Sequence, residues 1–274
     1  MKWILFSIGW LLACILLAAL LVYAIRKKRG TKRRWIHVIW TVLASTILMV
    51  ATGAVYLSIY YHHDASAEPF LVSGERVAVS PFARGLMFDG PSDSRAVIFY
   101  PGAKVEAEAY APLMYKIAEE WGDCFLVEMP ANMAMLDADA AEDIQQEHHY
   151  DQWYLAGHSL GGVTAATYLQ EHPEDFSGLI LLAAYSTGQL SEDLQVASLY
   201  GDQDGVLNRE EYEKNRNHLP DNTEERIIAG GNHAQFGNYG DQSGDGTAVI
   251  SREEQQQQVI QALKSMTNEE NILR

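Results

Sequence analysis

The chain has 274 residues, of which 48% are hydrophobic, and a formal net charge of −16 at pH 7. Residues 1–60 contain eight Lys or Arg and no Asp or Glu, so residues 61–274 hold 12 basic and all 36 acidic side chains. Such an acidic remainder excludes a nucleic-acid-binding domain, which needs a basic surface. The two cysteines, Cys14 and Cys124, exclude a disulfide-stapled scaffold, and no close Cys/His cluster indicates a structural zinc site.

Two apolar stretches, residues 3–25 and 36–60, are each long enough to cross a bilayer as a helix. Residues 26–34 between them include seven Lys or Arg, and aromatic residues lie near the ends of both stretches. Because basic loops stay in the cytoplasm, we predict a two-helix transmembrane anchor over residues 1–60 with a cytoplasmic loop 26–34. The chain would then be a multi-pass cell-membrane protein whose remaining residues lie outside the cytoplasm.

A signal peptide is the alternative interpretation of this region. The first stretch is longer than an ordinary signal core and is followed at once by basic residues, as a stop-transfer segment is. The second stretch could itself be the signal, with cleavage after Ala65-Ser66-Ala67. A basic cluster can also bind nucleic acid, but its place between two apolar stretches favours a role in topology.

Residues 61–75 are predicted to be a short polar tether, and residues 76–274 an α/β domain in which strands alternate with helices. A hairpin at 76–80 and 85–88 is followed by strands at 96–100, 124–129, 152–156, 179–184, 195–200 and 226–229. Helices are expected at 106–121, 138–149, 160–171, 209–219 and 252–266, the last with glutamines 255–258 on a solvated face. This alternation predicts a mainly parallel sheet with helices on both faces, preceded by two transmembrane helices.

The sequence Gly157-His158-Ser159-Leu160-Gly161 lies between a predicted strand and a predicted helix. A sharp strand-to-helix turn exposes the serine hydroxyl, and its tight backbone needs glycine on both sides. The helix N-terminus and the backbone N–H after the serine then face a developing oxyanion. This context predicts that Ser159 is a nucleophile.

A serine hydroxyl needs a base to accept its proton. His233 follows the last predicted strand in a glycine-rich loop, whereas the other histidines lie in a membrane stretch, the tether, helix ends or the turn itself. The strand ending near residue 200 is followed by two candidate acids, and we choose Asp204, with Asp202 as the alternative. These aspartates, or Asp241 and Asp245, are also candidate calcium ligands, but the EF-hand spacing and its terminal glutamate are absent.

The segment from about residue 96 to residue 266 resembles the α/β-hydrolase superfamily, with nucleophile, acid and histidine in that family's order. The resemblance implies an oxyanion hole formed by the backbone N–H of Leu160 and by one from the loop after an early strand. Pro101-Gly102 stands in that loop where the family usually has His-Gly, which leaves Ala103, our choice, or Lys104.

Residues 232–240 also resemble a bacterial branch of small, dienelactone-hydrolase-like proteins. The nucleophile of that enzyme type is a cysteine, whereas this chain has Ser159, so the resemblance does not imply lactone chemistry. Many members of the superfamily carry a lid domain before the strand that bears the acid. Only about ten residues, 185–194, occupy that place here, which implies an open site without a large apolar cap.

We therefore expect a membrane-anchored serine hydrolase, without cofactor or metal, that acts on an ester of a small-molecule or lipid-like substrate. The same residues can cleave thioesters or peptides, or carry out perhydrolysis. A non-catalytic sensor or binding module with this fold is the alternative from a different functional class. A complete triad argues against it, since such a module has no need of a serine at a strand-to-helix turn.

Overall fold

The structure is a computed structural model that describes residues 2–29, 34–92 and 94–267. The chain divides into two compact units, Met1–Ile59 and Tyr60–Arg274. We call them the helical unit and the α/β unit. Each is described by itself below.

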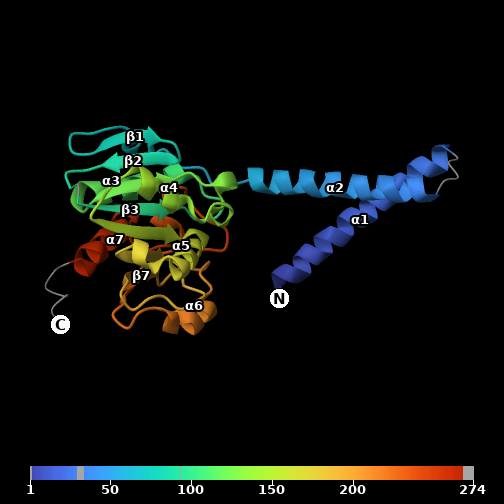
Figure 1. Cartoon of the computed structure of the whole chain (residues 1–274). Helices are drawn as coiled ribbons and strands as arrows, with labels where there is room; N and C mark the ends of the chain where they lie inside the picture. Colours follow the sequence, from blue (N-terminus) through green and yellow to red (C-terminus); the bar gives the residue numbers. More distant parts are fainter. Residues whose placement is uncertain (1, 30–33, 93, 268–274) are drawn as a thin grey trace. The chain divides into compact units, whose positions relative to one another are not determined.

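The helical unit consists of α1 (Lys2–Arg29) and α2 (Arg34–Ser58), which pack against each other (Figure 1). Among the described residues, one helical stretch, Val38–Ser58, is long and apolar enough to cross a membrane. The apolar stretch Leu12–Ile25 within α1 is shorter. Both predicted spans thus remain predictions, and residues 30–33 of the predicted basic loop lie outside the described residues.

The described part of the α/β unit contains an eight-stranded sheet with the strand order β1-β2-β4-β3-β5-β6-β7-β8. Strands β1 and β2 form an antiparallel hairpin, β2 pairs antiparallel with β4, and all the other pairs are parallel. The strands are β1 (Ala78–Phe82), β2 (Gly85–Asp89), β3 (Arg95–Tyr100), β4 (Asp123–Val127), β5 (Gln152–His158), β6 (Gly178–Leu182), β7 (Gln195–Gly201) and β8 (Glu224–Ile228). The predicted mainly parallel sheet is confirmed.

Helices cover both faces of this sheet because its central strands are apolar on both sides. One face packs against α3 and α7 through side chains such as Leu113 and Leu263, and the other against α4 and α5 through Ile144 and Leu169. The α-helices are α3 (Ala111–Glu120), α4 (Ala140–Glu147), α5 (Leu160–Glu171), α6 (Arg209–Asn215) and α7 (Arg252–Met266). Short 3₁₀ turns are η1 (Glu68–Phe70), η2 (Ala107–Tyr110), η3 (Pro130–Asn132), η4 (Ala134–Leu136), η5 (Pro173–Asp175), η6 (Arg216–His218) and η7 (Ala234–Phe236).

Two predicted boundaries differ from the structure for reasons of proline chemistry. The helix expected at 106–121 begins as η2 and becomes α-helical only at Ala111. Pro112 occupies the first turn of this α-helix, where its missing N–H breaks no intrahelical hydrogen bond. Pro81 lies within β1 instead of separating two strands. Strand β1 is at the edge of the sheet, where a missing N–H breaks no hydrogen-bonded ladder.

The segment expected to be a polar tether is packed into the α/β unit. Tyr61 forms a parallel bridge with Val105, and the backbone N–H of Asp64 donates to the carbonyl of Asn238 over 2.8 Å. Ala67 has no exposed surface. Cleavage after Ala67 would therefore require this segment to unfold locally first.

Candidate active site

Ser159 lies between β5 and α5 in a strained backbone conformation, with φ 52° and ψ −126°. Its backbone N–H donates to the carbonyl of Leu182 at the end of β6 over 2.8 Å. A Cβ on Gly157 would come within 2.5 Å of the backbone N of Gly162, and a Cβ on Gly161 within 2.2 Å of the carbonyl oxygen of Tyr100. Glycine is thus required on both sides because the turn is sharp and closely packed.

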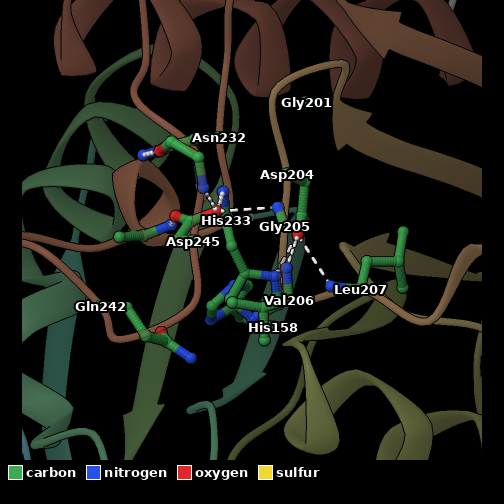
Figure 2. A network of polar contacts seen from close by, with 12 residues as sticks. His158, Gly201, Asp204, Gly205, Val206, Leu207, Asn232, His233, Gln242 and Asp245 are labelled. Carbon is green, nitrogen blue, oxygen red and sulfur yellow. Dashed lines mark hydrogen bonds and ion pairs between the residues drawn. The ribbon is translucent and has the colours of Figure 1, made fainter.

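Asp204 and His233 form a buried hydrogen-bonded pair (Figure 2). His233 Nδ1 lies 2.8 Å from Asp204 Oδ2, while Asp204 Oδ1 accepts the backbone N–H groups of Val206 and Leu207 at 2.8 and 2.7 Å. Burial by itself raises the pKa of Asp204, but the hydrogen bonds from His233 and the two backbone groups outweigh it and lower this pKa. Asp204 is therefore an anion that orients the imidazole.

Asp202, the alternative acid, has a different role. It is exposed, and its Oδ1 accepts hydrogen bonds from the backbone N–H of Gly230 at 2.7 Å and from the amide of Gln203 at 3.0 Å. These contacts link the loops that follow β7 and β8. Asp202 thus supports the loop before His233, and the carboxylate beside the imidazole is that of Asp204.

Three of the predicted residues meet at one edge of the sheet. Ser159, Asp204 and His233 follow β5, β7 and β8, and the carboxyl ends of parallel strands lie at the same edge. His158, next to Ser159, has its ring centroid 4.5 Å from that of His233. Within the described part of the chain, no hydrogen bond joins Ser159 to His233, and the buried His233 Nε2 has no partner.

The loop after β3 lies beside the turn that carries Ser159. Tyr100 is opposite Gly157 in the β3–β5 register, and the close approach of Gly161 to Tyr100 and Pro101 seats the start of α5 against this loop. The backbone N–H groups of Ala103 and Leu160 donate to no atom of the described residues. Both are therefore free to donate a hydrogen bond to an oxyanion.

Lys104, the alternative to Ala103, is already engaged. Its backbone N–H donates to the carbonyl of Asn132 over 2.7 Å, and its φ of 60° turns the chain away after Ala103. The preceding N–H of Gly102 donates to the hydroxyl of Tyr110. Of the three consecutive backbone donors in this loop, Ala103 has the unpaired one.

Comparison with known proteins identifies the family. A family model described as "Alpha/beta hydrolase family" matches residues 96–257, more than half of the chain. The chain belongs to the alpha/beta hydrolase family. A search of curated proteins finds no match.

Solved structures show the same fold. A putative hydrolase from Agrobacterium vitis S4 is 14% identical, with a TM-score of 0.54 over 71% of this chain and 100% of its own. A CIB-like hydrolase from Thermoplasma acidophilum is 13% identical, with a TM-score of 0.50 over 69% of this chain and 99% of its own. At these identities the likeness extends to the α/β-hydrolase fold alone.

His158 of this hydrolase is buried, and its hydrogen-bond partner is a tyrosine hydroxyl, not a carboxylate. The hydroxyl of Tyr110 accepts the backbone N–H of Gly102 at 3.1 Å and is hydrogen-bonded to His158 Nδ1 at 2.8 Å. Burial, together with the nearby His233, lowers the pKa of His158 well below its ordinary value. His158 is therefore a neutral imidazole that connects the turn at Ser159 to the loop of Ala103.

This lowered pKa predicts a pH-dependent stability. In the unfolded chain His158 takes up a proton near pH 6.5, whereas in the folded hydrolase it stays neutral, so acidification below pH 6.5 favours unfolding. The contribution is at most about 1.4 kcal/mol per pH unit. We expect the melting temperature of the wild type to fall between pH 6.5 and 5 more steeply than that of His158→Asn. Parallel melting curves would contradict this assignment.

Asp245 is a site residue that the sequence reasoning did not assign to the active site. Its Oδ1 accepts the backbone N–H groups of Gly205 and His233 at 3.0 and 3.2 Å, and its Oδ2 accepts that of Ala234 at 2.9 Å (Figure 2). One carboxylate thus links the Asp204 loop to the His233 loop. No group of metal ligands occurs among the residues that the structure describes, so the calcium alternative gains no support.

Two of the four glutamines expected on a solvated face are buried. Gln255 Oε1 accepts the backbone N–H of Asn232 at 3.0 Å, and its Nε2 donates to the Asn232 carbonyl at 2.8 Å. Gln256 Nε2 donates to the side chain of Asn238 at 2.9 Å. The expectation was wrong because the loop after β8 folds over α7, and its backbone groups need buried partners. Gln255 lies four residues before the apolar Val259 and therefore on the same face of α7, and this spacing was the available sequence signal.

Removing this clamp is expected to damage activity and stability together. Gln255→Ala leaves the buried N–H and carbonyl of Asn232 unpaired, at about 1–3 kcal/mol for each group. A small displacement of the adjacent His233 lowers kcat by about 10- to 100-fold. The control is Gln257→Ala, since Gln257 makes no side-chain hydrogen bond to the described residues. Melting curves and ester kinetics of the two variants check the prediction, and equal behaviour would contradict it.

Proposed function

We propose that the protein is a membrane-anchored serine hydrolase that cleaves carboxylic esters with Ser159, His233 and Asp204. The observation that carries the proposal is the buried Asp204–His233 pair, whose imidazole has an unpartnered Nε2 at the sheet edge where Ser159 stands on its strained turn. A buried imidazole oriented by a carboxylate is the base that a serine nucleophile requires.

The geometry supports a two-step acyl transfer. His233 Nε2 takes the hydroxyl proton as Ser159 Oγ attacks the ester carbonyl, and Asp204 stabilises the imidazolium that forms. The backbone N–H groups of Ala103 and Leu160 donate to the oxyanion. His233 then protonates the leaving alcohol, and water hydrolyses the acyl-enzyme by the same route. The Ser159–His233 hydrogen bond forms in the substrate complex, since catalytic contacts are often long without substrate.

The surroundings of the site favour an open, uncapped site over one enclosed by a lid domain. Residues 183–194, between β6 and β7, contain no helix, so no lid domain covers this part of the edge. The resemblance of residues 232–240 to dienelactone-hydrolase-like proteins adds the small, uncapped architecture to the proposal. Ser159 in place of a cysteine nucleophile separates its chemistry from theirs.

A fluorophosphonate probe tests the proposal. Such probes react with an activated serine at an oxyanion hole, so we expect stoichiometric labelling of the full-length protein at Ser159 and none of Ser159→Ala. Hydrolysis of p-nitrophenyl esters of graded acyl length should be lost in the same variant. A folded wild type that neither reacts with the probe nor hydrolyses any ester would instead favour a non-catalytic binding module.

The membrane part of the proposal predicts a defined topology. Val38–Ser58 is apolar and mostly exposed in the helical unit, as expected of a helix that faces lipid, and the basic residues at 26–34 favour a cytoplasmic loop. We expect protease added to intact cells, or to spheroplasts, to digest the α/β unit and to spare the helical unit. Replacing the seven basic residues by glutamine should abolish this orientation, and full protection of the wild-type α/β unit would contradict it.

A further inference from the structure

The segment that follows the candidate span is fastened to the loop that carries Ala103. The backbone N–H of Tyr61 donates to the carbonyl of Lys104 at 2.7 Å, and the N–H of Glu106 donates to the carbonyl of Tyr61 at 2.9 Å. Ser58 ends the span, and only two residues separate it from Tyr61. Three residue steps cover at most about 11 Å. The chain is therefore joined to the candidate span through a short segment that is hydrogen-bonded to the loop of Ala103.

The same segment is fastened to the loop that carries His233. The hydroxyl of Tyr61 accepts the backbone N–H of Ser243 at 3.2 Å. The backbone N–H of Asp64 donates to the carbonyl of Asn238, whose side-chain amide donates to the hydroxyl of Ser66 at 2.7 Å. Because both loops of the site hold this segment, the tie is to the catalytic edge as a whole and does not depend on one contact.

An exposed apolar turn lies at this edge. Met135 and Leu136 are neighbours in η4, each 59% exposed. The turn follows β4 and packs beside α5, the helix that begins after Ser159. The carbonyl of Asn132, just before the turn, accepts the backbone N–H of Lys104. Two neighbouring large apolar side chains are thus exposed next to the candidate active-site edge.

The backbone before this turn is strained. Ala131 and Asn132 have φ values of 52° and 54°, although neither is glycine. Consecutive left-handed residues of this kind cost free energy and persist where the surroundings hold them for a function. Met135 and Leu136 follow these two residues and are exposed.

We propose that the ester substrate is an amphiphile resident in the lipid bilayer, and that Met135 and Leu136 enter the lipid surface at the point where the substrate is taken up. This inference rests on the proposed function, since it names the substrate class for the same Ser159 site. Lipid is the occupant that the segment at Tyr61 indicates, because the residues that join the α/β unit to the candidate span are hydrogen-bonded to both loops of the site. The acidic α/β unit, with 12 basic and 36 acidic residues in positions 61–274, favours zwitterionic or uncharged lipids over anionic ones.

The test uses the full-length protein in zwitterionic phosphatidylcholine vesicles that contain a long-chain acyl ester, beside a soluble short-chain ester in the same vesicles. The variant combines Met135→Ser with Leu136→Ser, outside the catalytic triad and oxyanion donors. We expect turnover of the vesicle-borne ester to fall at least about tenfold, from the loss of two apolar contacts with lipid, and turnover of the soluble ester to stay within about twofold. The matched control combines Val72→Ser with Ile227→Ser, which are 61% and 58% exposed elsewhere on the unit. It should retain both activities.

The outcomes separate the two proposals. Unchanged turnover of the vesicle-borne ester in the Met135/Leu136 variant overturns the lipid contact. An equal loss of both activities, with a lowered melting temperature, also overturns it, because the turn would then be structural. A folded wild type that hydrolyses neither ester in a Ser159-dependent way overturns the proposed function itself.

Discussion

Replacing Ser159 by alanine is expected to slow ester hydrolysis by about 10⁴-fold or more while the protein stays folded. In the proposed mechanism the hydroxyl oxygen of Ser159 attacks the ester carbonyl, and among the described residues Ser159 is the one that stands on a strained strand-to-helix turn beside unpaired backbone donors. Alanine has the same backbone requirements as serine at φ 52°, so the strain at the turn is unchanged. Steady-state kinetics with a short-chain ester, together with a melting curve, measure the effect.

A matched control separates loss of the nucleophile from loss of a buried hydroxyl. Ser198 on β7 is buried, and its hydroxyl hydrogen-bonds that of Tyr212 at 2.8 Å. Ser198→Ala should cost about 1 kcal/mol of stability and leave the turnover nearly unchanged. Retention of more than a few per cent of wild-type turnover by Ser159→Ala would exclude Ser159 as the nucleophile.

Asp204→Asn is expected to lower kcat by about 10³- to 10⁴-fold. Asp204 Oδ1 accepts two backbone N–H groups, so the carbonyl oxygen of an asparagine must stay there and its NH₂ group must face His233. The imidazole then accepts at Nδ1 and carries its proton on Nε2. In that tautomer it cannot take the proton of Ser159.

Asp202→Asn is the control for this prediction, because it also removes one carboxylate charge after β7. Its oxygen can still accept the backbone N–H of Gly230, so kcat should change by less than about threefold. The ratio of the two kcat values is the measurement. A larger loss of kcat in Asp202→Asn than in Asp204→Asn would assign the role of the acid to Asp202.

Local sequence patterns predicted most of the helices and strands. The spacing of apolar residues placed α5 and α7 at the bounds that the structure has, and short apolar runs ended by glycine or proline located the central strands. These signals are local because periodicity decides which face of an element can be buried. The start of α3 was misplaced, since the apolar spacing continues through η2 while the proline at position 112 sets the first α-helical turn.

The sequence by itself determined the strand-to-helix turn at Ser159 and the position of His233 after the last strand, because both follow from element order and glycine chemistry. Only the tertiary structure decided between Asp204 and Asp202, two residues apart on one loop, since the direction of each side chain depends on which loop packs against it. The same holds for the choice between Ala103 and Lys104, since the N–H of Lys104 donates to the carbonyl of Asn132 while that of Ala103 is unpaired.

Burial of polar side chains was likewise decided by tertiary contacts. Gln255 is polar and sits on an amphipathic helix, so its sequence context predicts exposure, but the backbone of the β8 loop needs a buried donor and acceptor. The segment around Tyr61 is polar and short, so its sequence predicts a tether. In the structure it is hydrogen-bonded to Lys104 and Glu106. A local sequence pattern shows which environments a residue tolerates, whereas its hydrogen-bond partners come from distant parts of the chain. Those partners decide which carboxylate lies beside His233, which backbone N–H groups stay unpaired and which side chains support the loops.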